Sequence, residues 1–557
     1  MKSCIKTSYI WNLITCIASF FYKIYCGSHL SKVADSIKIS AVNSRIGQRI
    51  TGFNDSDYYH SDSAICRKLS GVKCGFFALL NRFMDFICIK LFRKKSFPDF
   101  MEYKAVRRRI TLIAVAMVLV LGLFTGSTKI ILLGFIAIAS VWLMCSSYET
   151  GIYILATYSF VDFFLRQYMA GLAGAWDELF FILMVCVCIY KGVRSRKEVI
   201  SKSTPLGNNI FIFIGIFAIL LLLSPDFSIG IEGIRAVCQY MLWFFVVLQL
   251  LRNTSDVKNV LMVFTIVAGF MAMHGVFQYI IGAEMPDAWV ESSESIRTRV
   301  YSILSSPNIF GSVMVLAAPV TFSMAMIAEK KREKLFYIFL FLCMMGSLVF
   351  TYSRGAWIGA ACAIGIYVFA KNKKLIIPAI IAGFMVLIFV PSIGNRFFFM
   401  FSSAYLSSSM KGGRLIRWIT ALKIMKAHPL MGLGLGQFGG AVAMNHGLVA
   451  YVEGLPIKTF YMDNYFLKIG VEAGLIGLIA FIWLMYRVFI LSIKTIGITK
   501  DKNMKELEIG ILAGLTGVIC HNFVENVFEV PMMNSLFWML AAIMMHMWYM
   551  NHNNRRE

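Results

Sequence analysis

The sequence contains a succession of apolar runs, each about long enough to cross a lipid bilayer. A membrane-crossing helix needs roughly 20 mainly apolar residues, and such runs follow one another from Ile110 to the C-terminal region. Backbone polar groups must be satisfied inside each crossing segment, so the runs have to be helices. The predicted spans are residues 110–126, 129–147, 150–166, 176–191, 208–224, 233–251, 258–281, 307–327, 335–352, 356–370, 375–390, 465–493, 508–524 and 531–550. We therefore predict an all-α polytopic membrane protein with about 12–14 transmembrane helices.

The composition supports a membrane protein and argues against a nucleic-acid-binding protein. The chain has 557 residues, of which 58% are hydrophobic and 15% are charged, whereas a soluble domain carries roughly 25% charged residues. The formal net charge is +24, but the Lys and Arg residues form short clusters between apolar runs, as topology signals do. We therefore expect membrane lipid, and no nucleic acid, as a partner. The 13 cysteines form no C-x-x-C pair and no zinc spacing, so we predict neither a metal site nor a cofactor.

Residues 1–109 differ from the rest of the chain. They hold short amphipathic pieces around a polar middle and end in a basic run, Arg93 to Arg109. Apolar pieces this short are typical of helices that lie on a membrane surface. We predict a cytoplasmic, membrane-surface extension over residues 1–109 and a polytopic transmembrane domain over residues 110–557.

The basic clusters predict how the domain is oriented. They precede the first span and recur at residues 191–202, 330–334, 371–374, 494–505 and 555–556. All of these fall on one side if the spans alternate, and cytoplasmic loops are the ones enriched in Lys and Arg. Both termini are therefore predicted to be cytoplasmic, and the long loop at residues 391–463 extracytoplasmic. After this loop, the run at 465–493 exceeds one crossing, so we expect a short entry helix at residues 464–473 before the span.

Several arginines depart from the basic-inside pattern because they lie at predicted outer ends of spans. Guanidinium groups stay charged and bind phosphate through paired hydrogen bonds, and a charge at membrane depth is usually functional. One interpretation is a solvated outer face. The other, which we favour, is an extracytoplasmic site for a diphosphate at the lipid headgroup level. The arginines are Arg297 and Arg299 before SSPN (305–308), Arg354 in TYSRGAW, and Arg414 and Arg417 on one face of a predicted helix.

Acid and base candidates occur on the same predicted side. Asp463 in YMDNYFL could act as a base or could cap the helix that starts at Asn464. A histidine in a loop, such as His446, is most often simply solvated. The other candidates are His428 and, in HNFVENVFEVP, His521, Asn522, Glu525 and Glu529. The stretch GLGQFG (434–439) has the letters of a dinucleotide fingerprint, but it lacks the strand–helix context that such a site requires.

Four stretches together resemble the O-antigen ligase and polymerase superfamily of bacterial surface-polysaccharide enzymes, over roughly residues 264–537. They are RVYSILSSPNIFGSVMVL, YSRGAWIGAACAIGIYVF, RLIRWITALKIMKAHPLMGLGLGQF and DNYFLKIGVEAGLIGLIAF. The resemblance implies an integral-membrane, GT-C-like glycosyltransferase that is metal-independent. It implies transfer of a glycan from undecaprenyl diphosphate to an acceptor hydroxyl on the outer face of the bacterial cytoplasmic membrane. The resemblance implies that the acceptor is another lipid-linked glycan (in a polymerase), a lipid core (in a ligase) or a protein.

The resemblance also implies roles for individual residues. Arg299 and Arg354 correspond to arginines that hold the diphosphate in the family. Asp463 stands where the family pattern has a histidine base, so we expect it to deprotonate or to orient the acceptor hydroxyl. The predicted catalytic residues are thus Asp463, Arg299 and Arg354. The predicted substrate-binding residues are Arg297, Asn308, Arg414, Arg417, His446 and Asn464.

A transporter, such as a polysaccharide flippase, is the alternative interpretation. Fourteen spans suit a transporter as well as an enzyme. Transporters typically show inverted repeats and broken spans with polar groups at the midplane. Here the sequence shows no clear repeat, and the basic residues gather at the predicted outer ends. The pattern therefore favours the enzyme.

Overall fold

A computed structural model describes residues 149–194, 202–284, 298–304, 306–389, 391–399, 402–410, 413–448 and 461–553, together with Val141 and Met144. All the regular structure in these ranges is helical, which confirms the all-α prediction. The predicted extension at 1–109 and the first two predicted spans lie outside the described residues, apart from Val141 and Met144. The division into these two domains therefore stays a prediction.

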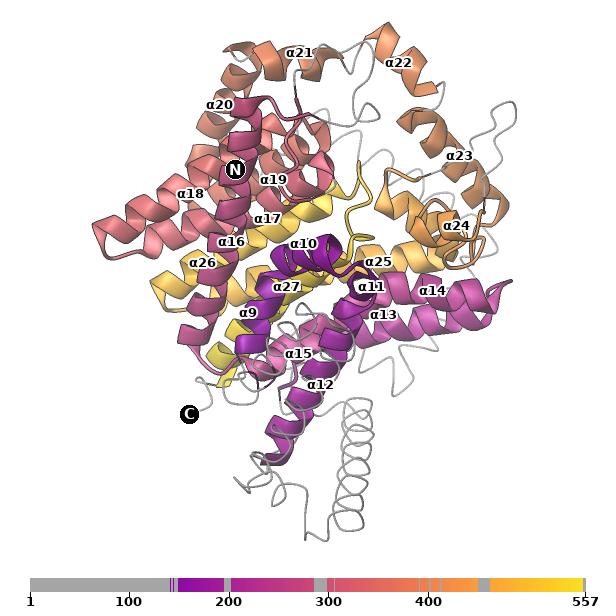
Figure 1. Ribbon diagram of the computed structural model, residues 1–557, viewed down its shortest axis with the longest axis horizontal. Coiled ribbons are helices and arrows are strands. Elements are labelled where there is room, and N and C mark those ends of the chain that lie inside the picture. The colour runs from indigo at the N-terminus through magenta and orange to yellow at the C-terminus, as the bar shows by residue number, and fades with distance from the viewer. Residues whose placement is uncertain are drawn as a thin grey trace, which may run out of the picture. The chain divides into compact units, whose positions relative to one another are not determined.

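The described helices follow the predicted spans from residue 150 onward (Figure 1). In chain order they are α9 (Thr150–Ala156), α10 (Tyr158–Tyr168), α11 (Ala170–Ala173), α12 (Trp176–Arg194), α13 (Pro205–Leu222), α14 (Phe227–Cys238), η3 (Gln239–Leu242), α15 (Trp243–Leu250), α16 (Thr254–Ile281), α17 (Pro307–Ile327), α18 (Lys331–Phe350), α19 (Arg354–Lys371), η5 (Lys373–Leu375), α20 (Ile376–Phe389), α21 (Pro391–Phe399), α22 (Ser403–Met410), α23 (Arg414–Ala427), α24 (Ala441–Asn445), α25 (Tyr465–Ile498), α26 (Lys502–His521) and α27 (Pro531–Asn553). The predicted span at 150–166 is divided between α9 and α10, with a break at Thr157.

The chain is a multi-pass membrane protein. Within the described ranges, six helical segments are long and apolar enough to cross a bilayer: Pro205–Leu222, Phe227–Leu250, Thr254–Ile281, Pro307–Ile327, Lys331–Phe350 and Tyr465–Ile498. Their outward faces carry large apolar side chains, such as Leu222, which is 74% exposed, and Ile280, which is 69% exposed. Exposed apolar surface on this scale is stable against lipid and not against water.

Small residues let α17, α19 and α26 approach one another closely. A Cβ built on Gly359 of α19 would lie 2.7 Å from the Gly517 carbonyl oxygen of α26. One built on Gly514 of α26 would lie 2.5 Å from the Leu316 carbonyl oxygen of α17. Membrane helices associate through such small-residue contacts because lipid supplies no hydrophobic drive between them. The packing sets the first turn of α19 against the C-terminal end of α26.

Gly355, in the first turn of α19, offers a test of this packing. A Cβ at Gly355 would lie 2.8 Å from both His521 Nε2 and Val524 Cγ2, and overpacking typically costs about 1–3 kcal/mol. We expect Gly355→Ala to lower the melting temperature of the detergent-purified protein, followed by intrinsic fluorescence. Gly365→Ala in the same helix is the control, since no neighbouring atom lies within 4 Å of a Cβ there. Equal melting temperatures for the two variants would contradict the close packing at Gly355.

The entry helix predicted at the start of the long run from residue 465 is confirmed. Within α25, Gly474 departs from helical geometry, with φ 63° and ψ −166°. The glycine-rich segment after α23, residues 429–434, lies across this break and pairs with its backbone groups. Leu433 N donates to Val471 O (2.8 Å) and Gly434 N donates to Glu472 O (3.0 Å). In the other direction, Leu475 N donates to Pro429 O (2.9 Å). The backbones approach too closely for side chains, since a Cβ on Gly474 would lie 2.2 Å from Leu430 O. The break therefore fixes α23 relative to the entry helix.

Candidate active site

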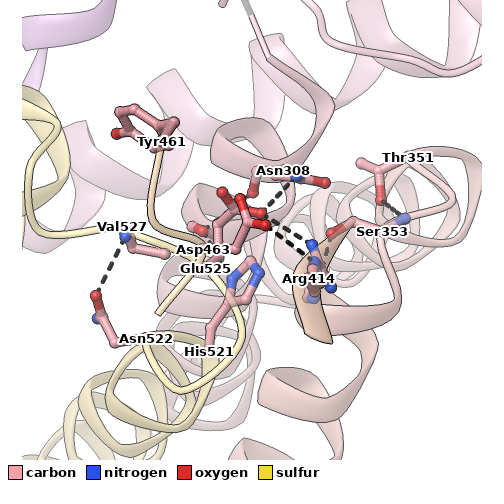
Figure 2. Close-up of polar contacts among 12 residues, drawn as sticks. Asn308, Thr351, Ser353, Arg414, Tyr461, Asp463, His521, Asn522, Glu525 and Val527 are labelled. Carbon is pink, nitrogen blue, oxygen red and sulfur yellow. Dashed lines mark hydrogen bonds and ion pairs between the residues drawn. The ribbon is translucent and has the colours of Figure 1, made fainter. Parts of the chain in front are cut away.

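Several helix ends bring polar side chains together at one place. Asn308 is the second residue of α17, where Pro307 occupies the first helical position. Arg414 and Arg417 begin α23. Asp463 precedes α25, and Glu525 lies in the turn between α26 and α27. Figure 2 shows the carboxylates of Asp463 and Glu525 turned toward Arg414, with Asn308 above them and the His521 ring beside Glu525.

A chain of hydrogen bonds joins Arg299, Asn308 and Glu525. One guanidinium nitrogen of Arg299 donates to Asn308 Oδ1 (3.1 Å), and Arg299 Nε donates to Thr351 O (3.0 Å). Asn308 Nδ2 in turn donates to Glu525 Oε2 (2.5 Å). The amide of Asn308 thus links the arginine to the carboxylate.

Two arginines of α23 complete the site. Arg414 donates to Glu525 Oε2 (3.3 Å), and its Nε lies 3.8 Å from Asp463 Oδ2. Arg417, one turn later, donates to Asp463 Oδ2 (3.0 Å) and to Tyr461 O (3.0 Å). The side chains of Asp463 and Glu525 are only 14% and 11% exposed, so these ion pairs are screened less than surface pairs. We call the set of Arg299, Asn308, Arg414, Arg417, Asp463 and Glu525 the arginine–carboxylate array.

The two carboxylates of the array have different environments. Burial raises the pKa of Glu525 to about 7, although the charge of Arg414 acts in the opposite direction. Asp463 adds to the increase because a neighbouring negative charge disfavours a second one. Asp463 itself contacts two guanidinium groups. The array therefore combines a carboxylate that contacts two arginines with one that contacts a single arginine and whose pKa is raised to about 7 by burial.

Buried residues of α26 and its C-terminal turn support Glu525. His521 is fully buried, and its Nδ1 lies 2.8 Å from Ser312 Oγ, which donates to Asn308 O (3.0 Å). Asn522 Oδ1 accepts from the backbone N–H groups of Val527 (3.2 Å) and Phe528 (3.1 Å). These contacts hold the turn that carries Glu525, and Figure 2 shows the Asn522–Val527 contact.

Arg354 starts α19, where the Ser353 hydroxyl caps the helix by accepting from Ala356 N (3.4 Å). Its guanidinium carbon lies 4.9 Å from the centre of the Tyr405 ring of α22. The next residue, Gly355, packs against His521. Arg354 is therefore in contact with α22, and Gly355 is in contact with His521, which lies beside the array.

The remaining predicted site residues have other roles or lie outside the described ranges. His446 Nε2 is 3.1 Å from Glu232 Oε1 of α14, at an exposed position. Asn464 caps α25, with its Oδ1 accepting from Leu467 N (3.0 Å), and is 6% exposed. The alternative that Asp463 caps this helix is therefore wrong, because the cap lies one residue later. Arg297 lies outside the described residues.

Two contributions to the site were not among the predicted site residues. Glu525 was recognised only as one of several acid and base candidates in its turn. Tyr461 was not recognised at all. A carboxylate inside the apolar turn FVENVF is a signal for Glu525. Tyr461 contributes its backbone carbonyl, which accepts from Arg417, so no side-chain pattern could have indicated it.

Residues 339–482 match the family model Wzy_C, described as O-antigen ligase. The matched segment includes Arg354, Arg414, Arg417 and Asp463, and it also contains the break in α25. A search of curated proteins finds no match to this chain.

Proposed function

We propose, from the match of residues 339–482 to the O-antigen ligase family model, that this chain transfers a glycan from undecaprenyl diphosphate to an acceptor hydroxyl. The acceptor is a second lipid-linked glycan, a lipid or a protein. In this proposal the reaction takes place at the outer face of the cytoplasmic membrane, and both termini are cytoplasmic. The distribution of Lys and Arg between the loops supports this orientation.

The observation that carries the proposal is the arginine–carboxylate array. Its three guanidinium groups and two carboxylates leave one net positive charge when both acids are ionised (3 − 2 = 1). Arg299 lies before α17, whereas Arg414 and Arg417 lie at the start of α23, and all three are held by contacts within the chain. Preorganised charge of this kind stabilises a leaving diphosphate without reorganisation during the reaction.

Each part of the array has a proposed role. Arg299 neutralises the departing diphosphate, and Arg354 holds the donor from the start of α19. Arg414 and Arg417 extend the anion site. Asp463 keeps these two arginines in place and orients the acceptor hydroxyl. Because guanidinium groups supply the positive charge, the proposed reaction is metal-independent.

The test uses the purified full-length chain in lipid vesicles with a synthetic undecaprenyl-diphosphate oligosaccharide and an acceptor glycan on the same lipid. We expect a new glycosidic bond to form in the absence of any ion gradient. Movement of the lipid-linked glycan between leaflets without bond formation would instead support the transporter and contradict the proposal.

A further inference from the structure

The array contains two carboxylates, and the reaction proposed above needs one proton acceptor. Asp463 Oδ2 contacts Arg417 (3.0 Å) and Arg414 Nε (3.8 Å). Both contacts of Asp463 are thus with charged guanidinium groups. Glu525 Oε2 contacts one guanidinium, that of Arg414, and the neutral amide of Asn308.

We propose that Glu525, and not Asp463, is the catalytic base that takes the proton from the acceptor hydroxyl. The inference rests on the function proposed above and names the residue that performs one of its steps. The acceptor O–H bond breaks, and its proton moves to the Glu525 carboxylate. The acceptor oxygen then bonds to the anomeric carbon of the donor glycan. The bond from that carbon to the phosphate oxygen breaks, and its electron pair leaves with undecaprenyl diphosphate.

Charge balance in the array supports this assignment. When Glu525 takes up a proton, the net charge of the array changes from one positive charge to two, since only Asp463 remains ionised (3 − 1 = 2). This gain occurs as the diphosphate develops its negative charge. The proton weakens one ion pair when it is on Glu525, that with Arg414, whereas on Asp463 it would weaken two, those with Arg414 and Arg417.

The groups that face Glu525 come from every element around it. Arg414 of α23 is the contacting cation, and Arg299 approaches through Asn308 of α17. Asp463 contributes the neighbouring negative charge, the Tyr461 side chain interacts electrostatically with Glu525, and the His521 ring lies beside Glu525 in Figure 2. The Nδ1 atom of His521 contacts Ser312 Oγ. Burial raises the pKa of Glu525 to about 7, and Glu525 contacts one guanidinium where Asp463 contacts two.

The test is the pH dependence of the transfer rate in the vesicle assay. Burial raises the pKa of Glu525 to about 7, and the base must be ionised, so the wild-type rate should fall as the pH is lowered through about 7. The donor is a diphosphate diester and keeps its charge over this range. We expect Glu525→Gln to lower the rate at least about 100-fold and to remove this pH dependence.

Further variants separate catalysis from folding. Glu525→Gln preserves the size of the side chain, and its melting temperature is measured beside the wild type. Glu525→Asp keeps a carboxylate, so it should retain a reduced rate that still depends on pH. Asp463→Asn should lower the rate but should keep the fall in rate below about pH 7, which we call the pH-dependent limb. Glu333→Gln, at an exposed position in the first turn of α18, is the matched control and should match the wild type.

The outcomes also distinguish this inference from the proposed function. A Glu525→Gln rate within about threefold of the wild type, with the same pH dependence, would overturn the assignment and leave the transferase intact. Loss of the pH-dependent limb in Asp463→Asn would transfer the role to Asp463. If the wild-type chain forms no glycosidic bond in the assay, the proposed function and this inference fail together.

Discussion

Replacing Arg299 with alanine is expected to lower the transfer rate by about two to three orders of magnitude, the usual effect of removing one preorganised charge-stabilising donor. Arg299 donates to both Asn308 Oδ1 and Thr351 O, so its guanidinium is fixed between the starts of α17 and α19. The variant loses positive charge at the diphosphate and also releases the Asn308 amide that contacts Glu525. The measurement is the initial rate of glycan transfer in vesicles at saturating donor.

Two further variants make the Arg299 result specific. Arg299→Lys keeps the charge but cannot reproduce the divergent hydrogen bonds of a guanidinium, so it should restore only part of the rate. Arg332→Ala is the control, since Arg332 is exposed at the opposite end of α18 from Thr351. A rate for Arg299→Ala close to that of Arg332→Ala would show that Arg299 does not contact the reacting diphosphate.

Arg414→Ala is expected to lower the rate at neutral pH by about 100-fold and to move the pH-dependent limb to higher pH. Arg414 contacts both carboxylates of the array, and its charge opposes the increase in the Glu525 pKa that burial causes. Without Arg414, the pKa of Glu525 rises further. A smaller fraction of Glu525 is then ionised at a given pH, and the rate recovers only in more alkaline buffer. The measurement is the transfer rate as a function of pH.

The controls for Arg414 lie at the same site and on the same helix. Arg414→Lys retains a positive charge near Glu525, so the limb should return toward its wild-type position. Lys423→Ala removes an exposed positive charge elsewhere on α23 and should leave the profile unchanged. A reduced rate for Arg414→Ala with an unshifted limb would mean that Arg414 binds substrate without influencing Glu525.

The helical architecture could be predicted from the sequence because apolar length and period are local properties. The break in α25 could also be expected, since the run from residue 465 exceeds one crossing and contains Gly474. The loop that fills the break could not. Its hydrogen bonds to Val471 and Glu472 use backbone groups, which carry no residue-specific signal.

The site could be predicted only in part. The sequence indicated the arginines of the site and their positions at the ends of predicted helices. However, the contact between Asn308 and Glu525 joins residues 217 positions apart, and it depends on close packing around α17, α19 and α26. The assignment of the α25 cap was ambiguous because Asp463 and Asn464 are adjacent and both suit that role. Only the backbone geometry decides between them.

The lipid product of the reaction tests the central claim most directly. In vesicles that contain the wild-type chain, donor and acceptor, mass spectrometry should detect undecaprenyl diphosphate in a one-to-one ratio with new glycosidic bonds. This ratio follows if the bond between sugar and phosphate breaks beside the arginines that hold the diphosphate. Intact donor, or undecaprenyl monophosphate as the lipid product, would contradict the account.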